Sequence, residues 1–132
     1  MKSTIYLLVA CLTFITSCRK DKEAVKGQWR WAATYQGGFI EHLIVPDAHA
    51  IVTLSLEADS IYITYLNNSI IHQGKYSIMK GDYVSTIHFD EDISTDKLII
   101  KQDEVIFYPS EDSLTLSDGY VEGSYYNFTK VR

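Results

Sequence analysis

Four histidines are the side chains of this sequence that most readily bind a metal ion, because a neutral imidazole is a common zinc ligand. Two histidines on one element reach the same ion only at short spacings such as H-x-H or H-x-x-x-H. Neither spacing occurs here. We therefore predict no metal site and expect four surface histidines: His42, His49, His72 and His88.

An acidic stretch offers oxygen ligands at alternate positions. Residues 90–96 read Asp-x-Asp-x-Ser-x-Asp, which matches the first four ligand spacings of an EF-hand calcium loop. That loop also needs glycine at its sixth position and an acidic residue at its twelfth, where this chain has Thr95 and Lys101. We interpret residues 90–96 as a solvated acidic hairpin tip.

Catalytic motifs are missing from the sequence. It contains no G-x-S-x-G and no glycine-rich phosphate loop. Carboxylate pairs such as Glu111-Asp112 fall in predicted turns, where they stay solvated and ionised instead of serving in acid-base catalysis. We predict no catalytic residue, no cofactor and no enzymatic activity.

The two cysteines, Cys11 and Cys18, lie near the start of the chain. Lys2 precedes an apolar stretch from Ile5 to Ile15, which contains Cys11 and is about eleven residues long. A membrane-spanning helix needs roughly 20 apolar residues. A short apolar run after a basic start is typical of a secretion signal that is removed from the mature protein.

Residues 15–18, Ile-Thr-Ser-Cys, resemble the lipobox of bacterial lipoproteins. The resemblance implies that residues 1–17 are a signal peptide and that the Cys18 thiol receives a diacylglycerol before the chain is cut on its N-terminal side. Two or three acyl chains hold a protein durably on a membrane. We expect an anchor on the cell envelope of a Gram-negative bacterium, at the outer membrane. Its periplasmic face and the cell surface stay open as alternatives.

Charged residues dominate 18–26, which we predict to be a flexible tether. Removal of Lys2 with the signal leaves 11 of the 12 basic residues against 17 acidic ones. No Lys or Arg occurs between Arg30 and Lys75, so no basic stripe follows a phosphate backbone and nucleic-acid binding is disfavoured.

Alternation with a period of two dominates the rest of the chain, and no helical pattern persists. The fold class we predict is all-β: an eight- or nine-stranded antiparallel up-and-down barrel, with an immunoglobulin-like sandwich as the alternative. We expect a short helix or a lid in the long connection 37–50. The predicted strands are 28–35, 51–57, 61–65, 70–79, 83–89, 98–101, 105–108, 114–117 and 124–131.

Two of these strands have clear faces. In the first, one face carries Trp29, Trp31, Ala33 and Tyr35. In strand 61–65, the odd-numbered residues Ile61, Ile63 and Tyr65 alternate with Tyr62 and Thr64.

Gly27-Gln28-Trp29 resembles the G-x-W signature that opens the first strand of lipocalins, and the aromatic last strand with its basic end resembles the small bacterial lipocalin-like domains. The resemblance covers residues 27–132. It implies a structural floor in which Gly27 and Trp29 begin the barrel and Lys130 or Arg132 packs on the Trp29 ring. It also implies binding of a small hydrophobic ligand.

The chain departs from true lipocalins because it is shorter and lacks a C-terminal helix and a disulfide. A small eight-stranded barrel can be filled by its own side chains. Trp31, Tyr65 and Phe107 are candidates either to line a pocket or to plug it. The alternative to ligand binding is therefore a filled barrel that acts as a protein–protein interaction module of an envelope complex, with partners unknown.

Overall fold

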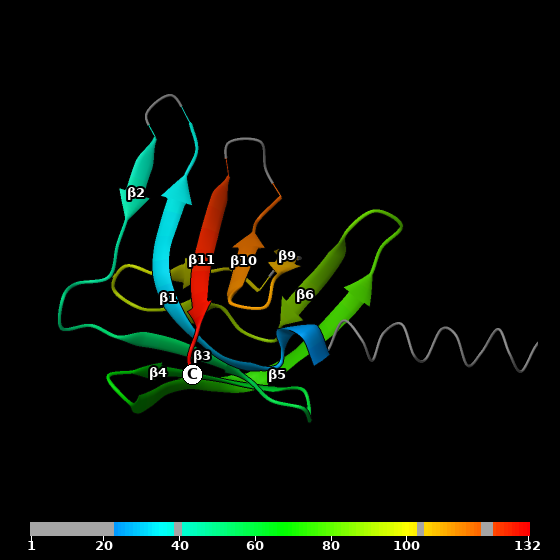
Figure 1. Ribbon diagram of the computed structural model, residues 1–132, viewed down its shortest axis with the longest axis horizontal. Helices are drawn as coiled ribbons and strands as arrows, with labels where there is room; N and C mark the ends of the chain where they lie inside the picture. The colour runs from blue at the N-terminus through cyan, green and yellow to red at the C-terminus, as the bar shows by residue number, and fades with distance from the viewer. Residues whose placement is uncertain (1–22, 39–40, 103–104, 120–122) are drawn as a thin grey trace, which may run out of the picture.

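A computed structural model describes residues 23–38, 41–102, 105–119 and 123–132 (Figure 1). Nine strands form one antiparallel sheet and two short strands form a separate pair. The large sheet comprises β1 (Gly27–Gln36), β2 (His42–Ile44), β3 (Val52–Leu56), β4 (Ile61–Leu66), β5 (Ser69–Lys80), β6 (Ser85–Phe89), β9 (Val105–Pro109), β10 (Ser113–Ser117) and β11 (Ser124–Lys130), while β7 (Ile93–Ser94) pairs with β8 (Ile99–Ile100).

The large sheet curls into a nearly closed barrel of eight strands. β1 pairs with β3 on one edge and with β11 on the other, so the order β1-β3-β4-β5-β6-β9-β10-β11 returns to its start. Apart from the short insertions β2 and β7–β8, each strand lies beside its neighbour in sequence. The prediction of an all-β up-and-down barrel is confirmed. The sandwich alternative is wrong, because an immunoglobulin-like sandwich needs two sheets and Greek-key connections.

Among the described residues, the pairing between neighbouring barrel strands is shortest between β6 and β9. Only two pairs of described residues join these strands, Thr86 with Ile106 and Ile87 with Val105. The β1–β11 junction, by contrast, runs from Trp29 to Gln36. The β7–β8 pair is inserted at this junction, in the chain between β6 and β9.

A helical turn at residues 23–25 precedes β1. Val25 is completely buried and belongs to the hydrophobic core. The folded part therefore begins before Gly27, and the expected flexible tether 18–26 is too long at its C-terminal end. Burial of an apolar side chain stabilises this turn by roughly 1.5–3 kcal/mol, which outweighs the charged composition around it.

Large apolar side chains from nearly every strand fill the interior. The completely or almost completely buried ones include Trp29, Tyr62, Phe89, Phe128, Leu54, Leu56, Ile87, Ile93, Leu98, Ile100, Leu114 and Leu116. Three of these belong to the β7–β8 segment, so this hairpin is part of the core. The interpretation of residues 90–96 as a solvated tip is wrong for Ile93, which packs inward between the half-buried Asp92 and the exposed Ser94.

A β-bulge changes the inward face of β1. Trp29 and Trp31 are buried as predicted, but the next buried side chain is Thr34, and Ala33 and Tyr35 are only partly buried. The register against β11 shifts between Trp31 and Ala33. Because a bulge inserts one residue, every later side chain moves to the other face. The buried Thr34 hydroxyl accepts a hydrogen bond from Trp31 Nε1 at 3.1 Å.

Strand β4 turns Tyr62 and Thr64 inward. Tyr62 and Thr64 are completely buried, whereas Ile61 and Ile63 on the opposite face are partly exposed. The register agrees, because Tyr62 lies opposite the buried Leu56 of β3. The outer surface of the barrel therefore carries an aliphatic strip on this strand.

Candidate functional site

The floor of the barrel is built around Trp29. Its indole Nε1 donates a hydrogen bond of 2.7 Å to the carbonyl oxygen of Val25, and the Lys130 ammonium lies 5.3 Å from the ring centre. Gly27 has a φ of +134° and its Cα faces the Lys130 stem, where a Cβ would stand 3.4 Å from Cε. The structure thus brings Gly27, Trp29 and Lys130 together.

Arg132 lies apart from this cluster. Its guanidinium forms an exposed ion pair with Asp112, in the turn before β10. Of the two basic residues considered for the Trp29 ring, only Lys130 contacts it. Trp29 is fully buried and hydrogen-bonded, so the described contacts of this cluster are packing contacts within the barrel.

The three candidates for pocket lining occupy different places. Trp31 is 2% exposed and Phe107 is 6% exposed, and both belong to the hydrophobic core. Tyr65 is opposite Thr53 of β3 and shares the outward face of β4 with Ile63. Tyr65 therefore cannot line the interior, because side chains alternate between faces along a strand.

At one mouth of the barrel, the β7–β8 tip meets the segment that follows β2. Lys97 forms an ion pair of 2.5 Å with Asp47, which closes the tip against this segment. The hollow left beneath them has a volume of about 50 Å³ and is bordered by Trp31, Pro46 and Leu66. Ligand pockets usually measure about 300–1,000 Å³. This hollow has room for water molecules only.

The predicted lid or helix at 37–50 takes another form. Within its described part, β2 pairs with the end of β1 and a turn follows at 47–50. Residues 39–40 lie outside the described residues. Pro46, Asp47 and Ala50 do border the hollow at the mouth, so this connection covers one end of the barrel without a helix.

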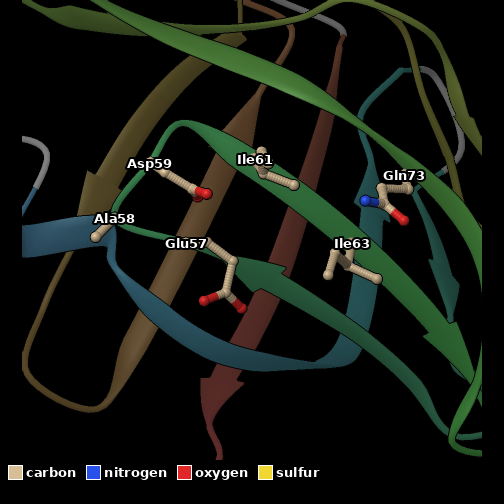
Figure 2. Close-up of a pocket in the computed structure, with 6 residues that line it drawn as sticks. All are labelled: Glu57, Ala58, Asp59, Ile61, Ile63 and Gln73. Atoms are coloured by element: carbon tan, nitrogen blue, oxygen red, sulfur yellow. The ribbon is translucent and has the colours of Figure 1, made fainter.

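A larger hollow lies on the outside of the barrel, on β4, β5 and the turn between β3 and β4. It measures about 310 Å³ and opens to solvent. Figure 2 shows Ile61 and Ile63 along its length with the carboxylates of Glu57 and Asp59 at one end, while the ribbons of β1, β10 and β11 pass behind them. The sequence analysis missed this site, although the alternation of Ile61 and Ile63 in strand 61–65 is the signal that could have indicated it.

Backbone hydrogen bonds fix the acidic end of this outer hollow. The amide of Glu57 donates to the carbonyl of Ile61, and the amide of Ser60 to the carbonyl of Glu57. Ser60 has a φ of 69°, so the turn is tight. The Ser55 hydroxyl donates to the Glu57 carboxylate at 2.5 Å. A pair of carboxylates beside an aliphatic strip suits a partner with both cationic and apolar side chains.

Tyr76 supports the same turn from beneath. Its hydroxyl donates a hydrogen bond of 2.7 Å to the carbonyl oxygen of Glu57. Burial, with the nearby charges of Asp59, Glu57 and Glu23, raises the pKa of Tyr76 to about 12. Glu23 thus adds a third negative charge near this end of the barrel.

Tyr62 occupies a tight position inside the barrel. Its ring packs edge-on against Phe89 with centroids 5.1 Å apart, and a Cβ at Gly74 would approach its ring and hydroxyl to 2.8 and 2.9 Å. Glycine at 74 is therefore required for Tyr62 to lie flat on β5. Burial, with the charges of Asp90 and Glu91, raises the pKa of Tyr62 to about 12.

The hydroxyls of Tyr62 and Thr64 are buried without a hydrogen-bond partner in the described part of the chain. Gly74 and Asp90 lie close to the Tyr62 hydroxyl, since a Cβ at 74 would also meet the Asp90 carboxylate. Leaving a buried hydroxyl unpaired costs about 1–3 kcal/mol.

The histidines are dispersed. His42, His49 and His88 are exposed, and Nε2 of His72 lies 2.9 Å from the carbonyl oxygen of Ser94. Among the described residues no three His, Cys, Asp or Glu side chains gather to hold a metal ion.

Two carboxylates of the acidic stretch accept hydrogen bonds from backbone amides. Asp90 accepts a hydrogen bond from the amide of Lys75, and Asp92 from the amide of Gln102. The Gln102 amide and the Lys101 ammonium hold the pKa of Asp92 below its usual value. The two carboxylates therefore connect the segment before β7 to β5 and to the residue that follows Lys101.

The predicted signal peptide 1–17 and the acylation site Cys18 lie outside the described residues. Within the described ranges, no helix has the length and hydrophobicity needed to cross a bilayer.

Comparison of the sequence with protein-family models found no matching family. Searches of the curated proteins and of the solved structures gave no match either. Function is therefore inferred from the residues themselves.

Proposed function

We propose that this chain is a non-catalytic envelope lipoprotein, anchored by acyl groups on Cys18, whose filled β-barrel binds a partner protein through its outer surface. The anchor is inferred from the lipobox-like residues 15–18 behind a short apolar segment. We assign it to the outer membrane and leave its face open.

The apolar core formed by the described residues is the observation that favours an interaction module over a ligand carrier. Trp31 and Phe107 are core residues, and the β7–β8 hairpin adds Ile93, Leu98 and Ile100 to the same cluster. In a barrel with such a core, the outer surface is the part that can bind a partner protein. The outer hollow, with Ile61 and Ile63 beside two carboxylates, is the contact we favour.

Site-specific photo-crosslinking in intact cells tests this proposal. A photoreactive residue at Ile63 should give a discrete adduct with one envelope protein, and the same residue at the exposed Thr129 of β11 should not. Reversal of charge by Glu57→Lys with Asp59→Lys should abolish the Ile63 adduct. Absence of an adduct at Ile63, or an adduct that survives the charge reversal, would contradict the proposed contact.

Binding of a small hydrophobic ligand is the second candidate, and the lipocalin-like start Gly27-Gln28-Trp29 of the first strand is the observation that supports it. The hollow beside Trp31, at about 50 Å³, is too small for such a ligand. We expect no thermal shift of the full chain with fatty acids or haem. A reproducible, saturable shift with one of them would favour the ligand carrier.

A further inference from the structure

The β5–β6 hairpin extends beyond the barrel wall. Among the described residues, β4 pairs with β5 only as far as Lys75, and β9 pairs with β6 only at Thr86 and Ile87. The two strands of the hairpin continue to pair with each other beyond these points, as far as Lys80 opposite Ser85. Figure 1 shows this hairpin standing clear of the neighbouring strands, to the right of the barrel.

Apolar side chains occupy the end of this hairpin. Tyr83 is 98% exposed, and Met79 and Val84 are also exposed. Gly81 makes the turn possible, because its amide donates to the Val84 carbonyl and a Cβ there would stand only 2.5 Å from that oxygen. The segment 79–85 contains one lysine and one aspartate, so it has no net charge.

The hairpin end and the start of the folded domain lie on the same side of the barrel. In Figure 1 the helical turn at 23–25 lies in the right half of the view, where the hairpin also projects. The charge of Glu23 acts on Tyr76 of β5, which places this turn near the hairpin's own strand. Four residues separate Cys18 from Glu23, so the Cα atoms of these two residues lie at most about 18 Å apart.

We propose that the end of the β5–β6 hairpin, formed by Met79, Tyr83 and Val84, contacts the headgroup region of the membrane to which Cys18 is anchored. The short connection holds this side of the barrel near the bilayer. Tyrosine suits that depth, because its ring is apolar and its hydroxyl stays hydrated. The hairpin would then be a second, non-covalent contact that fixes the orientation of the domain. This inference rests on the proposed anchoring.

Environment-sensitive labels test the contact. Because Cys11 leaves with the signal and Cys18 is acylated, a new cysteine is the only free thiol of the mature protein. Tyr83→Cys is labelled with a nitrobenzoxadiazole dye, and the full acylated protein is reconstituted into vesicles of phosphatidylethanolamine and phosphatidylglycerol. Ile70→Cys is the matched control, since it is exposed at the far end of β5, about 30 Å away along the strand.

The label at position 83 should brighten several-fold on reconstitution and be quenched by nitroxide-labelled lipid, while the label at position 70 should respond to neither. Equal responses at the two positions in vesicle-bound protein would overturn the membrane contact. Failure of the anchoring itself gives a different result, because protein without acyl groups does not float with the vesicles. Cys18→Ser supplies that reference.

Discussion

The Lys130 ammonium lies 5.3 Å from the centre of the Trp29 ring and joins the last strand of the barrel to the first. β1 and β11 form the junction that closes the barrel, and Trp29 is directly opposite Lys130 in their register. The lysine stem also covers Gly27, so one side chain protects both the ring and the adjacent backbone.

Replacement of Lys130 should measure this contact. Lys130→Met keeps most of the stem and removes the charge, and should lower the free energy of unfolding by about 0.5–1 kcal/mol, because a cation over an indole at an exposed site is worth that much. Lys130→Ala should cost more, since the stem is lost too. Urea unfolding gives the values. Arg132→Met is the control, expected within about 0.5 kcal/mol of the parent because its ion pair is exposed; a larger effect there than at Lys130 would reverse the assignment.

The two buried tyrosines should respond oppositely to loss of their hydroxyls. Tyr62→Phe removes a buried hydroxyl that lies near the Asp90 carboxylate but makes no hydrogen bond of normal geometry within the described residues, so stability should stay equal or rise. Tyr76→Phe removes the hydrogen bond to the Glu57 carbonyl and should cost about 1 kcal/mol. Chemical denaturation of the pair checks this; a loss at Tyr62 as large as at Tyr76 would mean that the Tyr62 hydroxyl is paired.

Alkaline pH should destabilise the protein through the same residues. The pKa of Tyr62 and of Tyr76 rises from 10.0 to about 12 on folding, because burial and nearby carboxylates disfavour the phenolate. A pKa raised in the folded state adds stability that is fully present below pH 10 and is lost as the pH rises toward 12. Unfolding curves across this range should show the decline. The Tyr62→Phe, Tyr76→Phe double variant should show a smaller decline, and an unchanged one would contradict the assignment.

The β7–β8 hairpin should prove to be part of the core. Leu98→Ala removes a buried side chain and should cost about 2–5 kcal/mol, while Ile99→Ala, at the exposed next position, should cost about 0.5 kcal/mol or less. The Leu98→Ala cavity should also bind a small apolar molecule such as benzene. Similar costs at the two positions would mean that the hairpin does not fill the barrel.

Much of the fold could be predicted from the sequence, because side chains that alternate between faces define strands. Val52, Leu54 and Leu56 of β3 face inward as their alternation indicates. The alternation of side chains predicts the wrong face where a β-bulge shifts the strand by one residue. The bulge between Trp31 and Ala33 cannot be read from residue types, since it depends on the register of β11, about 90 residues later.

The candidate site was harder to predict. The alternation in β4 indicates two faces, but the face that turns inward is decided by cross-strand packing: Tyr62 fits against Phe89 over the bare backbone of Gly74. Ile61 and Ile63 are consequently placed outside. No local pattern contains that information, so Tyr65 was considered for the interior and the outer hollow was missed.

Lipid anchoring at Cys18 is the central claim of this account, and the intact mass of the protein purified from bacterial envelopes tests it most directly. We predict a mature chain that begins at Cys18 and is heavier than its sequence by a diacylglyceryl group, with or without an additional N-acyl chain. The Cys18→Ser variant should retain residues 1–17 and gain no lipid. An unmodified wild-type chain that still begins at Met1, or a Cys18→Ser variant processed like the wild type, would contradict the account.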